Sequence, residues 1–97
     1  MKVVYTPKAK ADLDGIIDHF RPLNPHALAK IHAEIIGAIS VIAQFPHAGR
    51  AQKPKAVRKL VVRKYNYLIY YGYDEAEQQV SILSVRHSAR QRSYSDR

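Results

Sequence analysis

The sequence contains no cysteine in its 97 residues and has no long apolar run. Without cysteine the chain forms neither a disulfide scaffold nor a thiolate metal site, so its fold must rest on packing, which agrees with a cytoplasmic location. The opening residues lack the apolar core of a signal peptide, and no stretch approaches the roughly 20 apolar residues that span a bilayer. We therefore expect neither secretion nor membrane insertion nor a membrane partner.

The motifs of several common enzyme classes are also missing. There is no GxSxG elbow, no glycine-rich phosphate loop and no paired-carboxylate arrangement. Three acidic residues resemble a solvated helix face: Asp12, Asp14 and Asp18. Four histidines show no i, i+4 pair and no metal-ligand pattern: His19, His26, His32 and His47. The sequence therefore predicts no metal site and no cofactor.

Positive charge is plentiful and unevenly distributed. The net charge is +8, and residues 1–47 hold five basic and four acidic residues, whereas residues 48–97 hold eleven and four. A positive field confined to one half of a chain favours a polyanionic partner, either nucleic acid or an acidic protein segment. A basic surface that serves only solubility is the alternative.

Residues 1–97 are long enough for one hydrophobic core, so we predict a single domain. A short β-rich segment, residues 2–5, opens the chain. Thr6-Pro7 and Asn24-Pro25 each supply an N-cap residue followed by proline at the first helical position. Apolar spacing then predicts one helix that ends near Phe20, before Pro22, and a second that lasts to Phe45. Because their connector is short, the helices should form an antiparallel hairpin.

The second half of the chain changes to strand-like patterning. Residues 49–56 are expected to be a loop, residues 59–63 alternate as a strand does, and residues 67–73 are apolar on both faces, as in a central strand. A turn at 74–78 leads to an antiparallel last strand at 80–85. The fold class is therefore α+β: an N-terminal strand, a helical hairpin and a three-stranded antiparallel meander, with the helices on one face of the sheet. We expect the opposite face to stay partly open and to carry function.

Basic residues alternate with Tyr65, Tyr67 and Tyr94 in the second half of the chain, a pattern typical of nucleic-acid binding. For Tyr67, Tyr70 and Tyr71 a place in the core is favoured over base stacking. The candidate target-binding residues are Arg50, Lys53, Lys55, Arg58, Arg63, Arg86, Arg90 and Arg92.

The C-terminal region also holds residue types that a ribonuclease needs. Cleavage through the RNA 2′-hydroxyl requires a proton acceptor, a proton donor and cations that stabilise the transition state. Four residues could supply these groups: Arg63, His87, Arg90 and Tyr94. Alternatively, His87 ends the last strand and binds a backbone carbonyl.

Three segments occur in the order and spacing of one protein family. Val4-Tyr5-Thr6-Pro7-Lys8-Ala9, followed by Ala11-Asp12-Leu13, is similar to the start of ParE-type toxins. Phe45-Pro46-His47-Ala48-Gly49-Arg50 resembles their FPxxGR segment, and residues 82–90 resemble their final strand with its His-x-x-Arg ending. Over nearly its whole length the chain thus resembles the RelE/ParE toxin superfamily, and its ParE-like branch in particular.

The resemblance implies a toxin of a bacterial type II toxin-antitoxin system, with a cognate acidic antitoxin, ParD-like or similar, and a cytoplasmic target. ParE-like members poison DNA gyrase, whereas RelE-like members cleave messenger RNA on the ribosome. FPHAGR and the Arg86-His87-Ser88-Ala89-Arg90 ending favour a gyrase inhibitor that is not an enzyme. Two alternatives remain: a ribosome-dependent endoribonuclease that uses Arg63, His87, Arg90 and Tyr94, and a basic RNA-binding module without toxicity.

Overall fold

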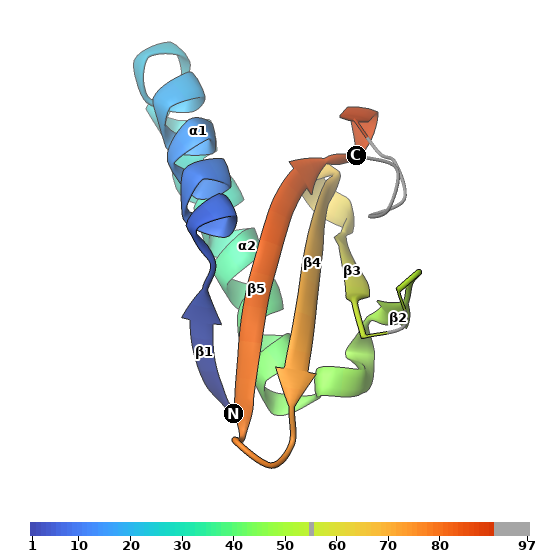
Figure 1. Ribbon diagram of the computed structural model, residues 1–97. Helices are drawn as coiled ribbons and strands as arrows, with labels where there is room; N and C mark the ends of the chain where they lie inside the picture. Colours follow the sequence, from blue (N-terminus) through green and yellow to red (C-terminus); the bar gives the residue numbers. More distant parts are fainter. Residues whose placement is uncertain (55, 91–97) are drawn as a thin grey trace.

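Two helices lie side by side across one face of a five-stranded sheet in the computed structural model, which describes residues 1–54 and 56–90 (Figure 1). In chain order the elements are β1 (Lys2–Tyr5), α1 (Pro7–Leu23), α2 (Pro25–Gln44), the 3-10 turn η1 (Pro46–Ala48), β2 (Arg50–Ala51), β3 (Arg58–Val62), the 3-10 turn η2 (Arg63–Tyr65), β4 (Tyr67–Asp74), β5 (Gln79–His87) and the 3-10 turn η3 (Ser88–Arg90).

The sheet has the strand order β1-β5-β4-β3-β2. β3, β4 and β5 form the expected antiparallel meander, and β1 pairs in parallel with β5, from Lys2 opposite Gln79 to Tyr5 opposite Ile82. The α+β fold class is confirmed. The expectation that residues 49–56 form only a loop was wrong, because Arg50 and Ala51 pair with β3 as the short edge strand β2. Two polar or small residues carry no alternation from which such a strand could be recognised.

Both helices begin where the sequence predicts. The Thr6 side chain accepts a hydrogen bond from the Ala9 amide at 3.1 Å, and the Asn24 side chain accepts one from the Ala27 amide at 3.0 Å. α1 does not end near Phe20, however, but continues through Pro22 to Leu23. In the last turn proline removes one N–H donor, and the Asn24 amide still reaches the Phe20 carbonyl at 2.7 Å.

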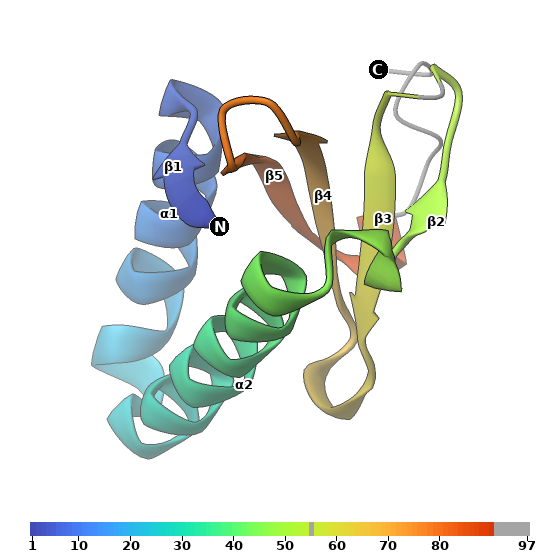
Figure 2. The ribbon, with the colours of Figure 1, turned by 90° about the horizontal axis from the view of Figure 1, so that it is seen from below.

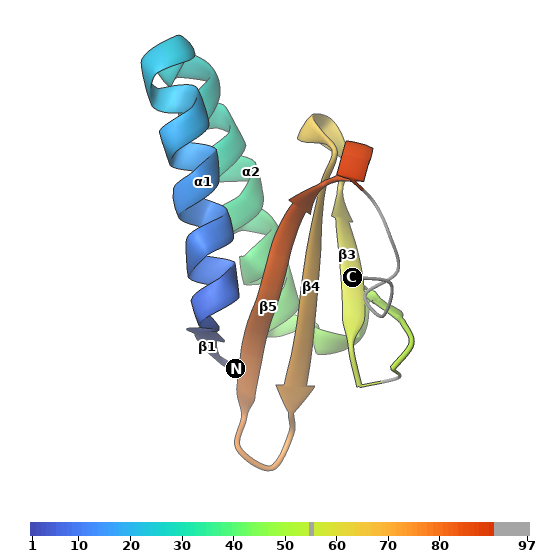
Figure 3. The ribbon, with the colours of Figure 1, turned by 45° about the horizontal axis from the view of Figure 1, so that its top comes forward.

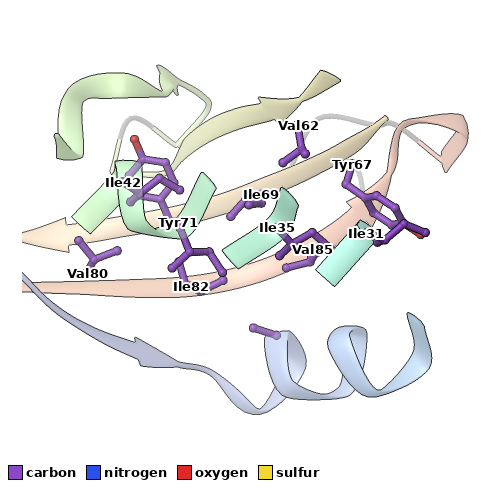
Figure 4. Packing of buried hydrophobic residues seen from close by; sticks show 12 residues of the cluster. Ile31, Ile35, Ile42, Val62, Tyr67, Ile69, Tyr71, Val80, Ile82 and Val85 are labelled. Atoms are coloured by element: carbon purple, nitrogen blue, oxygen red, sulfur yellow. The ribbon is translucent and has the colours of Figure 1, made fainter. Parts of the chain in front are cut away.

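The main core lies between α2 and the covered face of the sheet (Figure 4). Four isoleucines on one side of α2 are buried: Ile31, Ile35, Ile39 and Ile42. They face buried residues of the central strands, which include Ile69, Tyr71, Val80 and Ile82. By length and mean hydropathy α2 meets the criterion for a membrane span, contrary to the sequence expectation. Its buried isoleucine side nevertheless packs against the sheet, as in a core helix of a globular domain.

The opposite face of the sheet carries no helix among the described residues (Figure 2). Its centre is nevertheless not open, because Leu68 and Tyr70 are buried there with Val57, and Leu83 packs against them. Any open part of this face must therefore lie away from its centre. The preference for Tyr67, Tyr70 and Tyr71 as core residues is confirmed, with exposures of 6%, 0% and 0%.

Candidate target-binding surface

One end of the β4–β5 hairpin gathers basic side chains from η2 and from the last residues of β5. Tyr67 at the start of β4 pairs with His87 at the end of β5, so η2 and η3 flank the same end of the sheet (Figure 3). The Ser88 amide donates a hydrogen bond to the Asn66 carbonyl at 2.6 Å and joins the two turns. We call the surface formed by Arg63, Lys64, Arg86 and His87 the basic end.

The charge of the hairpin changes sign along its length. Arg63 and Lys64 are exposed at the basic end, whereas the turn at the other end of β4 holds three exposed acidic residues: Asp74, Glu75 and Glu77. Within residues 1–54 and 56–90 the ion pairs join Lys8 to Asp12 and His47 to Glu75, and neither lies at the basic end. Arg63 and Lys64 thus form no ion pair with another described residue.

Arg86 is held in place by its strand neighbours. Its guanidinium carbon lies 4.9 Å from the centre of the Tyr70 ring, and its Nε donates to the Ser84 hydroxyl at 3.0 Å. A cation stacked on an aromatic face and fixed by a hydrogen bond has lost much of its freedom before any ligand arrives.

His87 is exposed at the end of β5, and its ring makes two local contacts. Nδ1 accepts a hydrogen bond from the Ala89 amide at 3.1 Å, and the ring packs edge-on against Tyr67 at 5.3 Å between centres. The backbone partner of His87 is thus an N–H group and not a carbonyl, the alternative expected from the sequence. A neutral imidazole that accepts at Nδ1 carries its proton on Nε2, so this geometry leaves Nε2 as a donor.

The other candidate cations lie elsewhere or are not described. Arg50 and Lys53 are exposed near β2, at the opposite end of β3 from Arg63. Arg58 donates to the Gly49 carbonyl at 2.7 Å and stacks 5.8 Å from the Tyr73 ring centre. The predicted binding residues therefore form two groups. The side chains of four candidates are not described. Lys55, Arg92 and Tyr94 lie outside the described residues, and Arg90 is described only as the last backbone position of η3.

The FPxxGR segment acts here as a structural element. The buried Tyr71 hydroxyl accepts a hydrogen bond from the Gly49 amide at 2.8 Å and donates one to the Pro46 carbonyl at 2.6 Å. A Cβ at Gly49 would lie 2.8 Å from both the Lys59 carbonyl oxygen and the Tyr71 hydroxyl, so only glycine fits. Burial raises the pKa of Tyr71, although the Gly49 hydrogen bond and the Arg58 charge oppose this rise.

Asp12 has a role that sequence reasoning missed. It was assigned to a solvated helix face, but its Oδ2 accepts hydrogen bonds from the Ser84 hydroxyl and the Val85 amide, both at 2.9 Å. Its Oδ1 accepts one from Lys8 at 3.0 Å. β1 pairs with β5 only as far as Ile82. The Asp12 carboxylate therefore accepts hydrogen bonds from the part of the β5 edge that lies beyond β1.

Two grooves border the helices. One, of about 880 Å³, lies between α1 and the end of β5, where Phe20, Tyr67 and His87 are among its lining residues. The other, of about 360 Å³, runs between α1 and α2 and is lined largely by apolar side chains such as Leu13 and Ile36. In the described part of the chain no group of histidine and acidic side chains is arranged to hold a metal ion.

The family model for the ParE toxin of the type II toxin-antitoxin system parDE matches residues 3–92, so the chain belongs to the ParE toxin family. It is thereby a type II toxin-antitoxin toxin of the ParE/RelE superfamily. Curated relatives agree: toxin Y4kP of Sinorhizobium fredii is 31% identical over 93% of this chain and 91% of its own length, and toxin RelE2 of Caulobacter vibrioides is 33% identical over 92% and 97%.

Solved structures show the same architecture. The chromosomal ParDE toxin-antitoxin system from P. aeruginosa contains a chain that is 27% identical, with a TM-score of 0.76 and coverage of 90% of this chain and 95% of that one. The isolated E. coli RelE toxin has a TM-score of 0.60 at 15% identity, with coverage of 98% and 92%. The RelBE2 complex from Mycobacterium tuberculosis also gives 0.60, at 24% identity, with coverage of 89% and 95%. At these identities the two Rel structures support the fold alone.

Proposed function

We propose that this protein inhibits DNA gyrase as a ParE-like toxin, without catalysing a reaction, and that a cognate antitoxin keeps it inactive in the cytoplasm. The observation that carries the proposal is the similarity to the ParDE structure, at a TM-score of 0.76 against 0.60 for the RelE toxin. The match of residues 3–92 to the ParE family points the same way.

The geometry of His87 also argues against a role for this residue as the general base of a ribonuclease. A general base must offer a free lone pair to the proton it removes. Nδ1 of His87 already accepts the Ala89 amide, and no described carboxylate hydrogen-bonds to the ring to orient it for proton transfer. His87 therefore fits a binding or structural role better than that of a catalytic base.

An assay of both targets tests the proposal. The purified chain is expected to block supercoiling by gyrase and to leave messages on translating ribosomes intact. The variants His87→Ala and Tyr94→Phe should retain growth inhibition, because neither residue would transfer a proton. Cleaved messages together with unimpaired supercoiling would show that the gyrase proposal is wrong.

A ribosome-dependent endoribonuclease is the second candidate function. It is favoured by the 33% identity to a protein named toxin RelE2 and by the gathering of Arg63 and His87 at one end of the sheet. In that case His87→Ala should lower message cleavage by roughly 100-fold or more, the usual scale for a lost proton-transfer group. Arg63→Gln should lower it by roughly 100-fold as well, because a cation that stabilises the transition state is lost.

The antitoxin should be an acidic segment that covers the helical hairpin. Ile36 of α2 is 43% exposed and lines the apolar groove between α1 and α2. An amphipathic segment that folds on binding would cover the apolar groove and offset the net positive charge. The ParDE and RelBE2 structures are toxin-antitoxin systems, which supports such a partner.

Copurification from the native two-gene neighbourhood tests the antitoxin. We expect an acidic protein to copurify with the chain and Ile36→Lys to weaken its binding at least tenfold. Val61→Lys is the matched control, because Val61 is similarly exposed, at 46%, but lies on β3, away from the hairpin. Purification of the chain without a partner, or an equal effect of both variants, would contradict the proposed docking surface.

A further inference from the structure

We propose that the outer edge of β3 binds an extended acidic segment of the toxin's protein target, which joins the sheet there as an added strand. The identity of this target as gyrase rests on the proposed function. The preference of the edge for acidic strands depends only on this chain and can be measured with a peptide.

The outer edge of β3 is paired over part of its length. Among the described residues, the two of β2 pair with it, opposite Arg58 and Lys59, and no other strand does. The Gln52 amide also donates to the Val57 carbonyl at 2.8 Å on this side. Outward-pointing backbone groups recur at every second residue of an edge strand, so those of Val57 and Lys59 are followed by those of Val61, beyond the end of β2. We call this part of the edge, residues 60–62, the open edge.

The side chain at the centre of the open edge is also uncovered. Val61 is 46% exposed, whereas its neighbours Leu60 and Val62 pack with the main core. Because side chains alternate along a strand, Val61 lies on the other face of the sheet, beside its β4 partner Leu68, which is buried there. An added strand would pair the backbone groups of Val61 and pack a side chain against it, as in recognition by strand addition.

Charge selects the chemistry of the partner. Residues 35–73 hold seven basic residues and no acidic one. Lys59 precedes Val61 by two positions and Arg63 follows it by two, and neither cation forms an ion pair with another described residue. A strand with an apolar residue opposite Val61 and a carboxylate two positions to either side would meet both cations.

The same charges disfavour a second copy of this chain. Two open edges in antiparallel register about Val61 would bring Lys59 of each copy toward Arg63 of the other, and like charges placed opposite each other destabilise a strand pair. Cations on a sheet edge are a common protection against such pairing. The partner is therefore a different and acidic protein.

The uncharged groups of the open edge separate a protein strand from a nucleic acid. Phosphates would also be attracted by the cations. Phosphate oxygens accept hydrogen bonds but donate none to the Val61 carbonyl, and they gain nothing from an aliphatic side chain. A peptide strand uses the amide, the carbonyl and the side chain of Val61 together, so it matches this edge better than DNA or RNA does.

The place of the open edge in the sheet favours the target over the antitoxin. In the strand order β1-β5-β4-β3-β2, β3 lies on the opposite side from β1, and α1 lies over the β1 and β5 side (Figure 1). The groove proposed for the antitoxin runs between α1 and α2. A segment bound in that groove leaves the open edge for a second protein.

Fluorescence anisotropy with the full-length chain and a labelled acidic peptide tests the inference. The peptide carries a central valine, a glutamate two positions before it and another two after, with threonine between them. We expect it to bind, and to bind about tenfold more weakly when the valine nitrogen is methylated, because the N–H that pairs with the Val61 carbonyl is then lost. A peptide with lysines in place of the glutamates should also bind weakly. Equal binding of the methylated and unmethylated peptides would overturn the strand geometry.

Val61→Pro removes the outward amide from the open edge. Proline is accepted on an edge strand where its missing N–H would face solvent, so the variant should keep the circular dichroism of the wild type. It should bind the acidic peptide about tenfold more weakly. Val61→Thr keeps the amide and a side chain of similar shape and should bind nearly as the wild type does. Equal peptide binding by Val61→Pro and the wild type would overturn the proposal.

A charge swap tests the same edge without altering its backbone. Lys59→Glu/Arg63→Glu should reject the acidic peptide and bind the lysine peptide. Lys2→Glu/Lys30→Glu makes the same change in net charge at exposed positions of β1 and α2 and should keep the preference for the acidic peptide. An equal loss in both double variants would overturn the assignment to the open edge.

Three outcomes would assign the open edge to a different partner and overturn the proposal. A wild-type dimer that Val61→Pro converts to a monomer would assign it to a second copy. Tighter binding of duplex DNA or single-stranded RNA than of the acidic peptide, unchanged in Val61→Pro, would assign it to nucleic acid. Failure of the copurified toxin-antitoxin complex to bind the peptide would assign it to the antitoxin.

The supercoiling assay separates this proposal from the gyrase function. If the wild type blocks supercoiling, about tenfold more Val61→Pro should be needed for the same inhibition, and equal inhibition by both proteins would overturn the docking edge. If the wild type leaves supercoiling intact but binds the acidic peptide through Val61, the gyrase function is wrong and the docking edge stands with another target.

Discussion

The buried hydroxyl of Tyr71 accepts a hydrogen bond from the amide of Gly49 at 2.8 Å. This contact joins the middle of β4 to the segment that follows α2, 22 residues earlier in the chain, and the same hydroxyl donates to the Pro46 carbonyl at 2.6 Å. Arg58 extends the arrangement through its bond to the Gly49 carbonyl at 2.7 Å. Hydrogen bonds from the Tyr71 and Arg58 side chains thereby hold the backbone of the FPxxGR segment against the sheet.

Tyr71→Phe should destabilise the protein by about 1–3 kcal/mol, because the Gly49 amide and the Pro46 carbonyl would each lose a partner in a buried place. Urea denaturation of the two proteins measures the difference. Tyr73→Phe is the control: its hydroxyl contacts the exposed ring of His47 at 3.1 Å, and water can replace that contact. Equal effects of the two variants would show that the buried hydroxyl has no special role.

Gly49→Ala should cost about 1–3 kcal/mol, the usual range for overpacking a filled site, because the new methyl group would meet the Lys59 carbonyl oxygen and the Tyr71 hydroxyl at 2.8 Å. Gly37→Ala on α2 should instead stabilise the protein by about 0.5–1 kcal/mol, since nothing lies within 4 Å and alanine favours a helix. Thermal melting of both variants compares the two effects. A melting temperature of Gly49→Ala equal to that of the wild type would contradict the close packing described for this loop.

Alkaline pH should destabilise the protein through Tyr71. Burial raises the folded-state pKa of this phenol above the ordinary value of about 10, so the folded state holds its proton more tightly than the unfolded chain does. The resulting stability is fully present below pH 10 and is lost as the pH rises through the folded pKa. We expect stability above pH 10 to fall more steeply for the wild type than for Tyr71→Phe, and parallel pH profiles would rule this origin out.

Asp12→Ala should destabilise the protein by about 1–3 kcal/mol, because the Val85 amide would be left without its acceptor and the Ser84 hydroxyl would lose one partner. Asp18→Ala, at an exposed position of the same helix, should change the free energy of unfolding by less than about 0.5 kcal/mol. Hydrogen exchange of the Val85 amide gives a local readout and should become faster in Asp12→Ala alone.

Features governed by local chemistry could be predicted from the sequence. The cap-and-proline pairs fix the starts of α1 and α2, and the apolar run at 67–73 identifies β4 as the central strand. The prediction that α1 ends before Pro22 was wrong, because a proline in the last turn interrupts too few hydrogen bonds to end the helix.

Features that depend on distant contacts could not be predicted. Asp12 bonds to residues 72 and 73 positions away, and an aspartate on a polar helix face gives no local sign of such partners. The role of Tyr71 as a hydrogen-bond centre is likewise invisible in a strand that is apolar throughout. The sequence identified the candidate cations by residue type. Their separation into two groups at opposite ends of β3 could not be predicted, because it follows from the topology of the meander.

The parallel pairing of β1 with β5 has a consequence for synthesis. Residues 2–5 lie beside residues 79–82, so the first strand has no neighbour in the sheet until nearly the whole described chain has been translated. Contacts between residues so far apart in sequence form late and slowly. The nascent toxin therefore passes through most of translation without its finished sheet, and its native fold can form only after residues 79–82 have been made.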